Sequence, residues 1–95
     1  MHITTNNTIY GTQWKYIPDT GQVPLIADMS SDILSRKIDI SKFSLVYAGA
    51  QKNLGPSGVT AVIINKDIVD RSAEDLPSML SYKVLAESRS LFNTP

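Results

Sequence analysis

Apolar runs separated by polar turns dominate the chain and predict a β-sheet. Residues 23–27 form a continuous apolar run, which is typical of a strand covered on both faces. Residues 43–48 form a second apolar, β-prone run, and residues 59–64 form the strongest one. A shorter strand is expected at residues 2–5, before the polar stretch that follows.

The connections between these runs predict how the strands pair. Segment 29–42 is long enough for a crossover between parallel neighbours, which takes about a dozen residues or more. We therefore expect strands 23–27 and 43–48 to be parallel and adjacent, with a right-handed crossover. The turn Gly55-Pro56-Ser57-Gly58 is short, so strand 59–64 should run antiparallel to its predecessor.

The remaining residues carry weaker signals. Asn6-Asn7-Thr8 is expected to break the first strand, because asparagine tolerates left-handed backbone and competes for backbone hydrogen bonds. A short helical turn is expected within residues 39–43, and Asn65 can cap a helix over residues 66–72. Residues 73–92 predict an irregular arm with one or two short elements. The predicted fold class is α/β, with a mixed, mostly parallel sheet.

The composition argues against several classes of function. Nine basic side chains balance nine acidic ones in 95 residues, so no basic field indicates binding to nucleic acid or to anionic lipid. The chain has no cysteine and a single histidine, so neither a disulfide nor a metal site is expected. No apolar run reaches the roughly 18 residues that a membrane span needs, and the N-terminus does not resemble a signal peptide. We expect a cytoplasmic protein.

Two polar side chains follow neighbouring strands and are the strongest candidates for chemistry. Asp28 follows the run 23–27, and Lys52 follows the small residues Ala48-Gly49-Ala50, beside which a ligand has room. The carboxyl ends of parallel strands lie on one side of a sheet, where ligands bind. A lysine amine and a carboxylate placed there are what a pyridoxal phosphate enzyme needs. A solvated surface lysine and a turn or capping aspartate are the alternatives for these two residues.

Four segments resemble a known family. Residues 2–14 (HITTNNTIYGTQW), 27–32 (ADMSSD), 47–58 (YAGAQKNLGPSG) and 90–95 (SLFNTP) are similar, in order and spacing, to the phosphoserine aminotransferases of the class V aminotransferase family. Sister enzymes of that class share the aspartate and the lysine but not the sequence NNTIYG. The resemblance covers essentially the whole chain.

The resemblance implies a homodimeric enzyme with the fold type I architecture of pyridoxal phosphate-dependent transferases. Residues 1–95 would be a central, incomplete part of its pyridoxal phosphate-binding large domain, and both ends of the chain look cut. The implied reaction transfers an amino group between O-phospho-L-serine and 2-oxoglutarate, giving 3-phosphooxypyruvate and L-glutamate in L-serine biosynthesis. Many bacteria also use such an enzyme for pyridoxine biosynthesis. The segment alone is expected to be inactive.

The resemblance also implies the roles of individual residues. Lys52 is similar to the lysine that forms the Schiff base with the cofactor and moves the proton during transamination. Asp28 is similar to the partner of the pyridinium nitrogen, and Thr8 to the threonine near the ring hydroxyl. Gln51 resembles a ligand of the cofactor phosphate.

Two further residues, Asn93 and Thr94, resemble the pair that reaches the phosphate of the partner subunit's cofactor. The family's glycine-rich phosphate loop, its stacking tryptophan and its substrate-binding arginines and histidines are not expected in this chain. Two other interpretations stay open. One is another class V enzyme, such as an alanine–glyoxylate aminotransferase or a cysteine desulfurase, and the other is a non-enzymatic α/β domain in which Lys52 is merely exposed.

Overall fold

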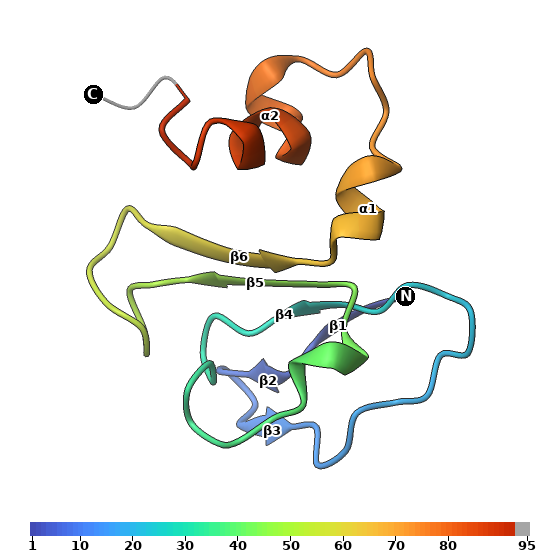
Figure 1. Ribbon diagram of the computed structural model, residues 1–95. Coiled ribbons are helices and arrows are strands. Elements are labelled where there is room, and N and C mark those ends of the chain that lie inside the picture. Colours follow the sequence, from blue (N-terminus) through green and yellow to red (C-terminus); the bar gives the residue numbers. More distant parts are fainter. Residues whose placement is uncertain (93–95) are drawn as a thin grey trace. The chain divides into compact units, whose positions relative to one another are not determined.

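The computed structural model describes residues 1–92 and divides the chain into two compact units (Figure 1). The first unit is Met1–Ile64, and the second begins at Asn65. Within residues 1–92, all the strands belong to the first unit.

A four-stranded sheet forms the centre of the first unit (Figure 1). Its strands are β1 (His2–Thr4), β4 (Ile26–Asp28), β5 (Leu45–Gly49) and β6 (Thr60–Ile64), in the order β1-β4-β5-β6. β4 is parallel to both β1 and β5, whereas β6 is antiparallel to β5. The predicted mixed, mostly parallel sheet is therefore confirmed, as is the direction of each predicted pairing.

Two strands begin later than the apolar pattern predicts, and local hydrogen bonding explains why. Pro24 has no N–H to donate to a neighbouring strand, so the run 23–27 enters the sheet only at Ile26. Before β5, the 3-10 helix η1 (Ile40–Lys42) occupies the expected position of a helical turn. The Phe43 N–H donates to the carbonyl of Ile40 at 3.1 Å as the C-cap of η1, which delays β5 to Leu45.

A small hairpin follows the predicted break after the first strand. β1 ends at Thr4, so the predicted break is confirmed, and β2 (Asn6–Asn7) then pairs antiparallel with β3 (Thr12–Gln13) in a hairpin that the sequence did not predict. The Asn7 side chain also shapes the turn, because its Oδ1 accepts hydrogen bonds from the N–H groups of Ile9 and Tyr10, each at 3.1 Å. Gly11 supplies the positive φ, +64°, that the turn requires.

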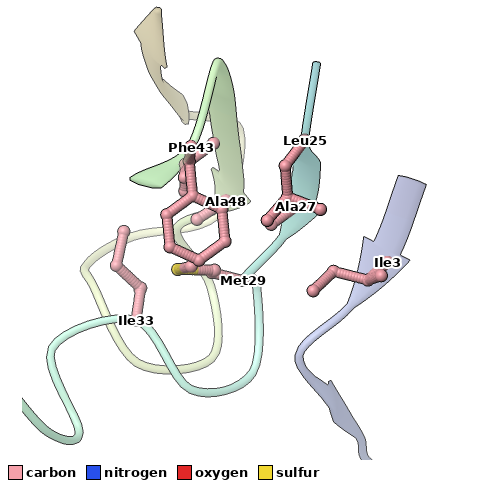
Figure 2. Close-up of a cluster of buried hydrophobic side chains, with 8 residues drawn as sticks. Ile3, Leu25, Ala27, Met29, Ile33, Phe43 and Ala48 are labelled. Carbon is pink, nitrogen blue, oxygen red and sulfur yellow. The ribbon is translucent and has the colours of Figure 1, made fainter. Parts of the chain in front are cut away.

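Alternate residues of β4 and β5 point into one hydrophobic core. Leu25, Ala27 and Met29 come from the β4 segment, and Val46 and Ala48 come from β5. Both alanines are fully buried, and their small size lets larger side chains approach the sheet. Figure 2 shows the rest of this cluster around them, namely Ile3, Ile33 and Phe43.

The other face of the sheet is less well covered than the continuous apolar run 23–27 predicts. Ile26 and Tyr47 are only half-buried, and Val62 of β6, which pairs with Tyr47, is 38% exposed. Trp14 packs against the core cluster. Its ring meets Tyr16 edge-on, with 5.6 Å between the ring centroids.

Leu25 offers a test of this core. Its side chain is 2% exposed, and replacing it by alanine is expected to lower the free energy of unfolding by about 2–5 kcal/mol, since a cavity is added to the lost transfer energy. Val23, two positions earlier, is 54% exposed, so Val23→Ala should change stability by about 0.5 kcal/mol or less. Urea denaturation of both variants measures the difference, and equal midpoints would contradict the proposed core.

The described part of the second unit, residues 65–92, contains three short helices. They are α1 (Lys66–Asp70), the 3-10 helix η2 (Ser78–Leu80) and α2 (Tyr82–Glu87). Asn65 caps α1 as predicted, because its side chain accepts a hydrogen bond from the Asp67 N–H at 3.0 Å. η2 and α2 are the one or two short elements expected after residue 73. Within residues 1–92, no helix is long and apolar enough to cross a membrane.

Candidate functional site

The polar residues at the carboxyl ends of β1 and β4 line an open pocket of about 220 Å³. Thr4 and Asp28 are the last residues of their strands, and the hairpin β2–β3 and the loop after β5 supply further sides. The lining residues are Thr4, Asn6, Asn7, Thr8, Ile9, Asp28, Ser30, Ser31 and Lys52. The pocket therefore lies where a parallel sheet is expected to bind a ligand.

Lys52 reaches this pocket from the loop that follows β5. Its Nζ donates a hydrogen bond to Thr8 Oγ1 at 2.8 Å, although the two residues are 44 positions apart in the sequence. Thr8 is carried by the turn of the hairpin β2–β3, so the unpredicted hairpin brings this hydroxyl to the lysine. Both side chains are exposed, which leaves the amine accessible to a small molecule.

Asp28 lines the same pocket and is held by its own turn. Its Oδ1 accepts two hydrogen bonds from Ser30, from the backbone N–H at 2.9 Å and from the hydroxyl at 2.7 Å. The Asp28 carbonyl accepts from the N–H of Thr5 at 3.0 Å, and the Thr5 hydroxyl oxygen lies 3.1 Å from the same carbonyl oxygen. Backbone and carboxylate are thus both fixed at the end of β4.

Ser31 and Asp32, which the sequence analysis did not single out, tie the hairpin to the turn after β4. The Ser31 hydroxyl donates to the Asn6 carbonyl at 2.8 Å and accepts from the Asn6 side chain at 2.9 Å. The buried Asp32 carboxylate accepts from the Thr5 hydroxyl and, at 3.1 Å, from the Gln13 amide. These bonds fix the base of the hairpin that carries Thr8. The run of polar residues after Asp28 is the sequence signal for these hydrogen bonds, but it does not show which groups they join.

Gln51 lies outside this pocket in the part of the chain that the structure describes. It is exposed and does not line the pocket; its amide lies against Gly49, where an added Cβ would be 2.8 Å from Gln51 Oε1. Asn93 and Thr94 lie outside the described residues. Of the six predicted site residues, the structure therefore brings together Thr8, Asp28 and Lys52.

The three groups that converge suit a flat, polar ligand better than a metal. A primary amine, a carboxylate and a hydroxyl surround one open space, so a ligand can meet a nucleophile and a negative charge at the same time. Residues 1–92 contain no group of three or more histidine, cysteine, aspartate or glutamate side chains that could hold a metal ion. His2, the sole histidine, lies beside Tyr47, with 3.0 Å between His2 Nε2 and the phenol oxygen.

Known proteins match the chain over its whole length. A phosphoserine aminotransferase of Lysinibacillus sphaericus is 67% identical over all 95 residues. The solved phosphoserine aminotransferase of Bacillus circulans subsp. alkalophilus is 62% identical over 99% of the chain, with a TM-score of 0.94. The pyridoxal phosphate-bound enzyme of Trichomonas vaginalis is 38% identical over 99% of the chain, with a TM-score of 0.88.

The chain spans 26% of the length of each of these relatives. The TM-scores show that the corresponding parts of these two solved enzymes have the same fold as this chain. A family model described as aminotransferase class-V matches residues 1–94. The chain belongs to the class-V aminotransferase family.

Proposed function

We propose that these 95 residues are the central part of the cofactor-binding large domain of a longer, cytoplasmic, homodimeric phosphoserine aminotransferase. The observation that carries the proposal is the meeting of Lys52, Asp28 and Thr8 at one pocket beyond the carboxyl ends of parallel strands. The 67% identity to the Lysinibacillus sphaericus enzyme supports the choice of substrate within the family.

The donor groups of the pocket fit pyridoxal phosphate. Bound in such a site, this cofactor supplies an electron-withdrawing ring that stabilises negative charge on a substrate carbon. Lys52 would bond the cofactor through its amine, Asp28 would balance the charge of the ring nitrogen, and Thr8 would donate to or accept from the ring hydroxyl. Gln51 is proposed to bind the cofactor phosphate, with Asn93 and Thr94 reaching the phosphate of the other subunit's cofactor.

Lys52 would also move a proton during the reaction. A lysine amine released from a covalent bond can act as base and then as acid, provided that it stays close to the reacting carbon. The Thr8 hydroxyl, 2.8 Å from the amine, would keep the side chain near the pocket when the amine is free.

The proposed reaction exchanges an amino group between O-phospho-L-serine and 2-oxoglutarate and yields 3-phosphooxypyruvate and L-glutamate. It would serve L-serine biosynthesis and, in bacteria that use this route, pyridoxine biosynthesis. The groups that bind the substrate phosphate and carboxylate would come from outside these 95 residues, so the longer enzyme is the form to assay.

Reductive trapping tests the proposal directly. The full-length protein that carries this segment is incubated with pyridoxal phosphate, reduced with borohydride, digested and mapped by mass spectrometry. We expect the label on Lys52 and turnover with phosphoserine in preference to alanine or cysteine. Labelling of a different lysine would refute the site, while labelling of Lys52 with a preference for alanine or cysteine would refute only the substrate.

A further inference from the structure

A serine side chain completes the ladder of hydrogen bonds between β4 and β5. The Met29 N–H donates to the Tyr47 carbonyl at 2.9 Å, so a regular parallel ladder would next have Gly49 donate to the Met29 carbonyl. That carbonyl is instead turned into the following loop, where it accepts from the Ile33 N–H at 2.9 Å. The Gly49 N–H donates to the Ser30 hydroxyl at 2.9 Å.

This bond fixes the direction of the Ser30 hydroxyl proton. A hydroxyl has one proton to donate, and its oxygen already accepts from Gly49. The proton therefore points to Asp28 Oδ1, 2.7 Å away, where the Ser30 backbone N–H also donates. Within residues 1–92, Oδ2 of Asp28 receives no such bond. One carboxylate oxygen is occupied by the turn, and the other is left for a ligand.

We infer that Ser30 is a positioning residue for Asp28, which ties the carboxylate at the end of β4 to the backbone of β5 and presents one oxygen to a protonated ring nitrogen. The inference rests on the proposed function, because it assigns the ligand of Asp28 to the pyridoxal phosphate ring. It adds a residue that acts through Asp28 without contacting the reacting atoms. The same bond links the loop after β4 to the last residue of β5, the strand that leads to Lys52.

The chain contains a matched control for this arrangement. Asp39 and Ser41 repeat the same spacing: Asp39 Oδ1 accepts from the Ser41 N–H at 3.1 Å and from its hydroxyl at 2.6 Å. These two bonds, the side-chain bond first, lower the pKa of the exposed Asp39 carboxyl. Ser41 makes no second bond to a strand within the described residues. Removing the Ser41 hydroxyl therefore removes a local turn bond but breaks no link to a neighbouring strand.

Three variants of the full-length protein separate the effect of the link between Ser30 and β5 from the effect of losing a local turn bond. Ser30→Ala should raise the dissociation constant for pyridoxal phosphate about tenfold, the equivalent of one net hydrogen bond. The ¹⁵N chemical shift of cofactor labelled at the ring nitrogen should move toward the unprotonated value, which a merely structural role would not cause. Ser30→Thr, which keeps the hydroxyl, should restore both quantities toward those of the native protein, and Ser41→Ala should change neither.

The outcomes distinguish this inference from the proposed function. If the native protein binds the cofactor at Lys52 but Ser30→Ala matches Ser41→Ala in affinity and ¹⁵N shift, the role of Ser30 is overturned and the proposed function stands. If the native protein binds no cofactor, the proposed function fails, and the inference fails with it because it names that ligand. Crystal structures of the native and Ser30→Ala proteins without cofactor supply an independent readout. A rotated Asp28 carboxylate in the variant supports the inference, and an unmoved one contradicts it.

Discussion

Replacing Lys52 by alanine in the full-length protein is expected to lower the rate of amino transfer at least about 1,000-fold. General acid–base catalysis alone contributes about 10²–10⁴-fold, and the variant also loses the amine that is proposed to bond the cofactor. The measurement is kcat/KM for phosphoserine with 2-oxoglutarate, together with the visible absorbance of the protein after addition of pyridoxal phosphate. We expect the absorbance of the variant to resemble that of the free aldehyde.

Lys42→Ala is the control for that change. Lys42 is an exposed lysine of η1 and does not line the pocket, so its removal should leave rate and absorbance near native values. A Lys52→Ala protein that keeps its rate within about tenfold of native would contradict the catalytic role. It would favour the alternative in which this lysine is only a surface charge.

Asp28→Asn is expected to lower kcat/KM about 100-fold or more and to weaken cofactor binding. The amide has the shape of the carboxylate and can still accept from Ser30 at Oδ1, so the turn after β4 should persist. What is lost is the negative charge that is proposed to face the ring nitrogen, and removing one preorganised electrostatic partner costs about 10²–10³ in rate. Steady-state kinetics and titration of the apoprotein with pyridoxal phosphate measure the two effects.

Asp39→Asn provides the corresponding control. Asp39 makes the same bonds to a serine two positions later, but it is exposed and lies outside the pocket. Its substitution should leave kcat/KM unchanged within about twofold. Comparable losses in both variants would contradict a role for the Asp28 charge that is specific to the pocket.

The apolar pattern predicted the sheet because parallel pairing follows from strand and crossover lengths. Placing Asp28 and Lys52 at neighbouring strand ends followed from the same argument, and both residues line the pocket. The hairpin was missed because two-residue strands such as Asn6–Asn7 are too short to show a period. Asparagine also favours turns, and here that preference forms the turn inside the hairpin.

The polar residues after β4 could not be assigned from the sequence for a different reason. Ser30, Ser31 and Asp32 are short polar side chains whose partners come from three separate segments of the chain. A periodic sequence pattern does not reveal such hydrogen-bond partners, because each bond depends on the tertiary arrangement. The individual roles of Thr8 and Gln51 came from family resemblance, and the structure brings only Thr8 to the pocket.

The 44 positions between Thr8 and Lys52 have a consequence for when the cofactor can bind during folding. Closing such a long loop costs conformational entropy that local contacts do not repay, so these groups meet only after β1, β4 and β5 have paired. Before that stage, the nascent chain has no pocket for pyridoxal phosphate. The cofactor would then act as a late ligand that slows unfolding by mass action, and it would not serve as a nucleus around which the chain collapses.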